Sequence, residues 1–197
     1  MLRTCAIQLT NKVYKHCHLP EARKAVYIYG FEVFLSTASS ILSILILSVA
    51  LSVFPATLLF LFMFCSLRAF VGGYHAKTYG RCFFLTHFVY FVTIAASQLI
   101  VLIPSSILYN AICISLVLFS TFIMLIFAPI KNVNHPLSNS QYRKNQKIAR
   151  ILAPMEGLFS ILLLIFPIDY SWGTLSAVTL MAVAVMMIIP KIQERRI

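Results

Sequence analysis

The chain has 197 residues, 60% of them hydrophobic, and a mean hydropathy of +0.91. A soluble domain, in which about half of the residues are apolar, is therefore excluded. The apolar runs are long and unbroken, which excludes a transmembrane β-barrel and predicts an all-α, polytopic membrane protein. A net charge of +11 would indicate nucleic acid binding in a soluble chain. Here the basic residues cluster between apolar runs, so we interpret them as topology signals and expect no nucleic acid partner.

The first 24 residues are polar and basic, with apolar residues recurring at helical spacing from Leu2 to Cys17. This pattern predicts an amphipathic helix on the inner leaflet of the lipid bilayer. His16, Cys17 and His18 are adjacent and would point in different directions on a helix, so we expect no metal site there. Nothing else in the chain indicates a cofactor.

Six apolar segments follow, and each is a predicted transmembrane helix. Their approximate bounds are Tyr27–Val49, Pro55–Leu67, Phe83–Ile103, Ile107–Ala128, Ile151–Phe166 (with Pro154 in its first turn) and Thr174–Ile189. The second has only about 13 residues, or about 20 Å of helix, whereas the hydrocarbon layer is about 30 Å thick. We therefore expect either that this helix continues through Arg68 toward Val71, or that the following loop dips below the headgroups.

Two long polar segments, residues 68–82 and 129–150, interrupt the apolar chain. With six spans and a cytoplasmic N-terminus, every Lys and Arg falls in residues 1–24, in one of these two loops or at the C-terminus. Because Lys and Arg set the orientation of a membrane protein, we predict that both termini and both loops are cytoplasmic. The chain is then one integral-membrane domain, residues 1–197.

The loop of residues 68–82 holds the strongest candidates for chemistry, His75 and Cys82. A cysteine protease needs a thiolate, a base and donors for the oxyanion, so we hypothesise that Cys82 is a nucleophile and His75 its base. On a straight helix their Cα atoms would lie about 10 Å apart along the axis. The segment must therefore bend back, at Gly80 or at the Gly72-Gly73 pair. The alternative is a topogenic loop in which the two residues are an incidental pair.

Glu32 and Glu156 lie near the inner ends of the first and fifth predicted spans. A carboxylate in lipid is costly, so we expect each to face protein or water. Each is a candidate partner for Arg68 at the membrane boundary and a candidate for orienting His75. The serine-rich first span suits close helix packing, either in a homodimer or within one chain.

The motif residues resemble those of the accessory gene regulator B (AgrB) family. Arg68, the run Gly72–Ala76 (GGYHA) and Cys82 look like that family's signature of an Arg, a Gly-rich stretch ending in His-Ala, and a later Cys. Ala128-Pro129 followed by Asn134–Leu137 is similar to the family's Ala-Pro pair and Asn-x-Pro-Leu element. Length, basic inner loops and span number also match, so the resemblance covers nearly the whole chain.

This resemblance implies a membrane cysteine endopeptidase in the cell membrane of a Gram-positive bacterium. Such a protein removes the C-terminal tail of a short AgrD-like precursor peptide. It then assists closure of the remainder into a thiolactone or lactone ring, the autoinducing peptide of quorum sensing. The resemblance assigns His75 as the base and Cys82 as the nucleophile, and marks Arg68, Gly72 and Gly73 as motif residues without a settled role.

An acidic tail on the substrate would suit the basic inner face of the protein. We hypothesise that Lys131, Arg143, Lys144 and Lys147 help to recruit it, and the alternative is that they only set topology.

Two other function classes remain as alternatives. A transporter or export channel without peptidase activity would have ionisable or Gly/Pro-broken segments near mid-membrane, in repeated halves. Both candidate carboxylates instead lie near inner ends of spans. The third class is a structural or regulatory membrane protein with an inert loop. Alkylation of Cys82 discriminates, because it should inactivate only the endopeptidase.

Overall fold

The computed structural model describes residues 2–17, 20–74, 78–130, 138–166 and 169–194, and these residues contain helices and connections but no strand. The elements are α1 (Leu2–His16), the 3₁₀ helix η1 (Glu21–Arg23), α2 (Lys24–Ala50), α3 (Phe54–Val71), α4 (Tyr79–Val101), α5 (Ser106–Phe127), α6 (Asn139–Ile165) and α7 (Tyr170–Glu194). The predicted all-α fold is confirmed.

The helices α2 to α7 are long and apolar enough to cross a membrane, which confirms the prediction of six spans. Helix α3 continues through Arg68 to Val71, so the first of the two expectations for this short span is correct. Its 18 residues correspond to about 27 Å of helix. Arg68 thus lies in the last turn of a spanning helix, close to its polar end.

Helix α6 begins much earlier than predicted, at Asn139 rather than Ile151. The reason is a capping box: the Ser138 hydroxyl accepts from the backbone N–H of Gln141, whose side chain accepts from the backbone N–H of Ser138. Much of the second polar loop is consequently helical. Pro154 lies inside the helix, and its predicted place in the first turn is wrong.

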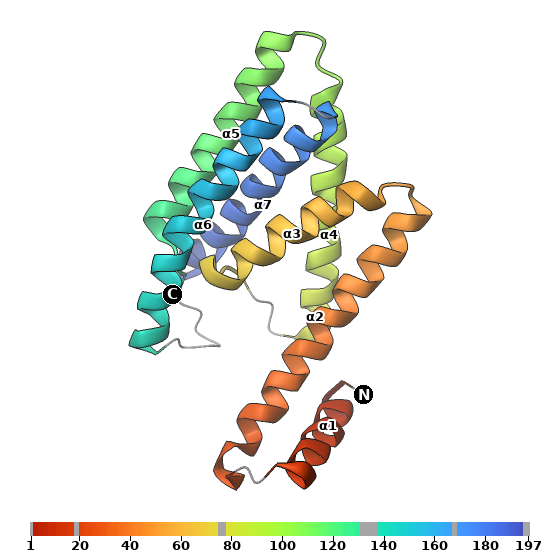
Figure 1. Cartoon of the computed structure of the whole chain (residues 1–197), viewed down its shortest axis with the longest axis vertical. Helices are drawn as coiled ribbons and strands as arrows, with labels where there is room; N and C mark the ends of the chain where they lie inside the picture. The colour runs from red at the N-terminus through yellow and green to blue at the C-terminus, as the bar shows by residue number, and fades with distance from the viewer. Residues whose placement is uncertain (1, 18–19, 75–77, 131–137, 167–168, 195–197) are drawn as a thin grey trace.

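Helices α5, α6 and α7 run side by side, and α3 is strongly inclined to them (Figure 1). Helix α7 forms the centre of the bundle and contacts α3, α4, α5 and α6. In the apolar part of α7, 61% of the residues are buried inside the protein, whereas the same share is 22–39% in the other five spans. Large apolar side chains such as Phe34, Phe88 and Phe122 are exposed on the outer helices, where lipid would cover them.

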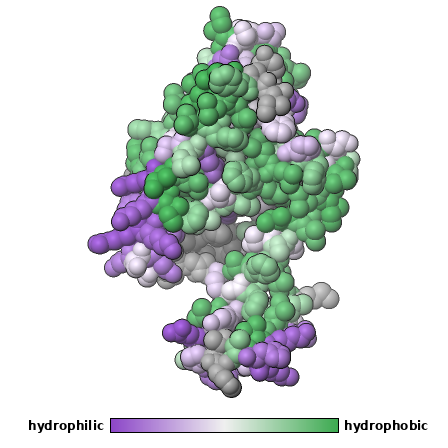
Figure 2. All heavy atoms as spheres, in the orientation of Figure 1, coloured by the Kyte–Doolittle hydropathy of each residue, from purple (hydrophilic) through white to green (hydrophobic). Residues whose placement is uncertain are grey.

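The predicted N-terminal helix is present as α1, which packs against α2 and buries Ala6 and Thr10. Hydrophilic residues gather over α1 and over the start of α6, both in the lower half of Figure 2. Exposed basic side chains on these two elements include Lys12, Arg143 and Lys144. Their cytoplasmic location stays a prediction from the charge pattern.

Candidate functional site

The last turn of α3 carries the half-buried Arg68, whose guanidinium contacts three parts of the chain. Its Nη2 donates to the carbonyl oxygen of Tyr74 at 2.6 Å, and its Nη1 donates to the Met186 Sδ on α7 at 3.2 Å. The same group lies over the Phe64 ring, 5.5 Å from the centroid. Arg68 therefore holds the backbone of Tyr74 in place against both α3 and α7.

A glycine turn follows α3 directly. Gly72 has φ +77° and Gly73 has φ +138°, both in the region that L side chains rarely adopt. A Cβ at Gly72 would lie 3.0 Å from the carbonyl oxygen of Ile130, and one at Gly73 would lie 3.2 Å from that of Met186. Conformation and space thus both require glycine, and the predicted bend at this pair is confirmed.

Two backbone hydrogen bonds hold this turn. The Tyr74 N–H donates to the carbonyl of Met186 at 2.9 Å, and the Ile130 N–H donates to the carbonyl of Val71 at 3.0 Å. The segment after α5, which contains the buried Ala128 and Ile130, is thereby paired with the end of α3. The motif that begins at Arg68 and the one that begins at Ala128 lie about 60 residues apart in the sequence, and they meet at this turn.

Cys82 lies in the first turn of α4, half-buried. Thr78 caps this helix, because its hydroxyl accepts from the backbone N–H of Arg81 at 3.3 Å. Gly80 also lies within this turn, so the bend predicted there is wrong; the chain turns before Tyr79 instead. The predicted base, His75, lies outside the described residues.

The Arg68 guanidinium interacts electrostatically with two thiols, Cys65 on its own helix and Cys82 on α4. A guanidinium is also a donor that can stabilise an oxyanion. The end of α3 and the start of α4 therefore bring together a cation, the fixed backbone of Tyr74 and a cysteine that interacts with this cation.

Neither candidate carboxylate pairs with Arg68, which corrects the prediction. Glu32 is buried and accepts from the Tyr79 hydroxyl at 2.8 Å, with Arg3 Nε 3.7 Å from its other oxygen. Glu156 is buried and accepts from the Ser66 hydroxyl at 2.7 Å, while its Oε2 has no hydrogen-bond partner among the described residues. Arg68 instead satisfies its donors on a carbonyl and a sulfur.

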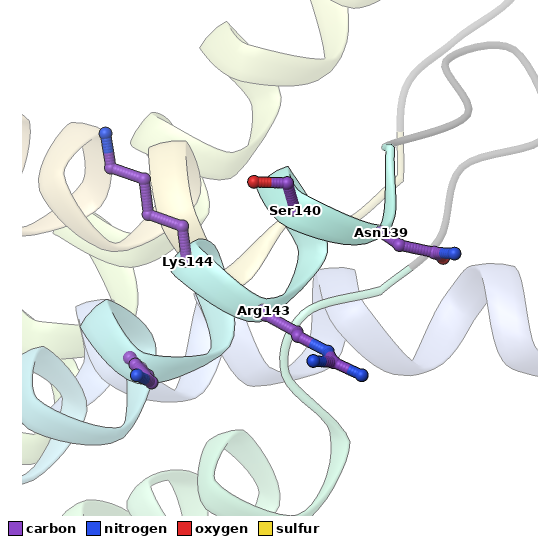
Figure 3. A pocket seen from close by; sticks show the side chains of 5 residues that line it. Asn139, Ser140, Arg143 and Lys144 are labelled. Atoms are coloured by element: carbon purple, nitrogen blue, oxygen red, sulfur yellow. The ribbon is translucent and has the colours of Figure 1, made fainter.

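Three of the four predicted recruiting residues, Arg143, Lys144 and Lys147, line one open hollow of about 630 Å³ at the start of α6, together with Asn139 and Ser140. Lys144 and Arg143 leave the helix in different directions (Figure 3), so the hollow has cations on more than one side. The fourth predicted residue, Lys131, lies outside the described residues.

Sequence reasoning missed three residues that shape this region: Tyr79, Ile130 and Met186. Tyr79 had a usable signal, because residues three apart on a helix are neighbours and Tyr79 precedes Cys82 by three. Ile130 and Met186 had none. Ile130 acts through its backbone N–H and carbonyl and Met186 through its carbonyl and thioether, and only the packing of distant segments brings these atoms to the glycine turn.

A scan of family models matches the accessory gene regulator B description to residues 6–189 of the chain. The chain is 28% identical over 154 residues to AgrB-like protein 2 of Clostridium perfringens (strain 13 / Type A), a match that covers 75% of this chain and 69% of that protein. It is 25% identical over 191 residues to an AgrB-like protein of Clostridium perfringens (strain SM101 / Type A), covering 91% of this chain and 85% of that protein. No solved structure matches the chain.

Proposed function

The chain belongs to the accessory gene regulator B family, and on this premise we propose that it is a membrane cysteine endopeptidase acting on an AgrD-like precursor peptide. Membership supports a role in agr peptide processing. The specific reaction proposed is removal of the C-terminal tail, followed by closure of the remainder into a ring. The site would face the cytoplasm of a Gram-positive bacterium.

In the proposed reaction the Cys82 thiolate attacks the scissile carbonyl, and the C–N bond breaks. His75 takes the thiol proton and returns it to the leaving amine, so the tail departs with a free N-terminus. The rest of the peptide stays on Cys82 as a thioester. A thiol or hydroxyl of the peptide then attacks this thioester, which forms the ring and releases Cys82.

The single observation that carries this proposal is the position of Arg68. Its guanidinium is bonded to the Tyr74 carbonyl, directly before His75, and interacts electrostatically with Cys82. A buried structural arginine would be expected to pair with a carboxylate, since isolated charges are costly in the membrane. Glu32 and Glu156, the two candidate partners, are bonded to Tyr79 and Ser66 instead. The arginine charge is therefore left available to the thiolate and to an oxyanion formed beside it.

The cationic hollow at the start of α6 fits the recruitment of an acidic substrate segment. Arg143, Lys144 and Lys147 are exposed and line this hollow. Attraction between exposed charges acts mainly on encounter and binding. We assign to these residues, with Lys131, a contribution to substrate affinity and none to the chemical step.

Mass spectrometry of a precursor co-expressed with the protein tests the proposal. The natural candidate is a small amphipathic peptide encoded beside this gene. Intact protein should yield the shortened peptide and a product one water lighter than the corresponding acid, which is the ring. Cys82→Ala should yield neither.

Cys113→Ala is the matched control, because Cys113 is a buried thiol on α5, away from Arg68. It should process the precursor as the parent protein does. Processing that persists in Cys82→Ala would overturn the endopeptidase assignment and favour a transport or structural role.

A further inference from the structure

A chain of polar contacts links the N-terminal helix to the helix that bears Cys82. Arg3 on α1 lies 3.7 Å from one oxygen of Glu32 on α2, and the Tyr79 hydroxyl on α4 donates to the other oxygen at 2.8 Å. We call these three residues the Glu32 link. Glu32 is only 9% exposed, and each of its carboxylate oxygens has one partner, an ion pair with α1 and a hydrogen bond with α4.

The link acts on the turn that holds the nucleophile. Tyr79 is the first residue of α4, and Cys82 follows three residues later in the same turn. Three residues of an α-helix rotate by about 300°, so the Tyr79 and Cys82 side chains leave α4 about 60° apart. Tyr79 therefore points to α2 while Cys82 points to the adjacent side, where Arg68 interacts with it.

A second contact between the same helices lies further along. The His87 Nε2 lies 3.0 Å from the Ser43 hydroxyl of α2, and its Nδ1 lies 2.8 Å from the carbonyl oxygen of Phe83. Cys82 thus sits between two polar contacts of α4 with α2. Two such contacts on one side of a helix restrict its rotation, and rotation of α4 is the motion that would carry Cys82 away from Arg68.

We propose that Arg3, Glu32 and Tyr79 are positioning residues, which hold the first turn of α4 so that the Cys82 thiol faces Arg68. The proposal rests on the proposed function of Cys82 as nucleophile. It makes α1 part of the working site, since Arg3 acts on the site only through Glu32. It also gives Glu32 a role different from pairing with Arg68.

The test measures two properties of Tyr79→Phe, Glu32→Ala and Glu32→Gln. One is kcat and KM for precursor cleavage. The other is the alkylation rate of Cys82 by a maleimide at fixed pH, in a background where the other four cysteines are replaced by Ala. Tyr79→Phe and Glu32→Ala should each lower kcat about tenfold, leave KM within about twofold, and slow alkylation about threefold, because the thiol leaves the cation.

Conservative and combined variants sharpen the assignment. Glu32→Gln keeps an acceptor for Tyr79 but loses the charge that attracts Arg3, so its activity should fall between those of the parent protein and Glu32→Ala; activity equal to the parent's would remove Arg3 from the proposal. The double variant Tyr79→Phe with Glu32→Ala should be no worse than either single one, since both remove the same contact.

Tyr90→Phe is the matched control. It also removes a phenol hydroxyl of α4, one that bonds Thr57 of α3 at 2.7 Å, but three helical turns from the start of α4. It should leave kcat and alkylation unchanged. Equal losses in Tyr90→Phe and Tyr79→Phe would mean general loosening of α4 and would overturn the proposal, as would Tyr79→Phe behaving like the parent.

The two proposals fail in different ways. If Cys82→Ala still processes the precursor, the proposed function fails, whatever the Tyr79 variants do. If the parent protein cleaves and Cys82→Ala does not, but the Glu32 and Tyr79 variants match the parent in both measurements, only the positioning role fails.

Discussion

The glycine turn after α3 and the start of α6 are the two polar regions of this membrane protein, and they are built in opposite ways. The turn is held by backbone hydrogen bonds with Met186 and Ile130, and a Cβ at Gly72 or Gly73 would lie only 3.0 or 3.2 Å from their carbonyl oxygens. The start of α6 is an exposed helix, fixed by its own capping box, with its cations in an open hollow.

This difference teaches how each region can tolerate change. In the turn, geometry is fixed by atoms from α3, α7 and the segment after α5, so a single methyl group or a lost donor displaces the whole arrangement. The exposed cations of α6 form no ion pair with any residue that the structure describes, so replacement by a like charge should preserve their effect. Shape governs the first region and net charge the second.

The largest effect is expected from Arg68. Both Arg68→Gln and Arg68→Lys should lower precursor cleavage at least about a hundredfold, because neither a neutral amide nor a single ammonium reproduces the two donors that bond the Tyr74 carbonyl and the Met186 sulfur. Mass spectrometric quantification of the shortened peptide measures this. Arg150→Gln, an exposed basic residue on α6, is the control and should change cleavage less than about threefold. Full activity of Arg68→Lys would show that charge alone suffices.

Gly72→Ala and Gly73→Ala should come next, with cleavage lowered at least about tenfold. The left-handed backbone alone costs about 1–2 kcal/mol for a residue with a Cβ, and the close carbonyls add to this. Gly80→Ala is the matched control, since nothing lies within 4 Å of its Cβ position and alanine is the better helix former. Thermal unfolding in detergent, measured beside cleavage, should show lower stability for the first two only. Unchanged stability and activity in both would refute a glycine requirement.

Neutralising Lys131, Arg143, Lys144 and Lys147 together, each to Gln, should raise KM about three- to tenfold and leave kcat unchanged. The parent's KM should also rise with ionic strength, because exposed charges are screened by salt. The matched variant keeps charge by exchanging Lys and Arg at the same positions and should behave as the parent. Unchanged processing with unchanged topology would discard the recruiting role.

The smallest effect on activity is expected from Ser66→Ala. It removes the donor to Glu156 and leaves a buried carboxylate with neither oxygen bonded to a side chain among the described residues, which should lower stability by about 1–3 kcal/mol. Cleavage should stay within about twofold, because this contact lies apart from the Arg68 and Cys82 contacts. Ser39→Ala, on the exposed side of α2, is the control for the unfolding measurement. A large loss of cleavage would instead connect Glu156 with the reaction.

Much of the fold was predictable from the sequence, because hydrophobic runs of spanning length leave a chain in lipid little choice but helices. The errors lie at helix ends. The start of α6 was missed because polar residues are ambiguous between loop and helix until a cap such as Ser138 and Gln141 is recognised. The bend at Gly80 was wrong because a glycine near a helix start needs no special conformation there.

By itself, the sequence determined the class of protein, the six apolar spans, the distribution of cations and the motif that includes Arg68 and Cys82. Each of these follows from residue type and spacing along the chain. Only the tertiary structure decided the partners: Arg68 with Tyr74 and Met186, and Glu32 with Tyr79. The physical reason is that a buried polar group must satisfy its hydrogen bonds with whatever atoms packing brings near. For Met186 and Tyr79 those atoms lie on helices far from their partners in the sequence, and for Tyr74 they follow a turn whose course the sequence does not state.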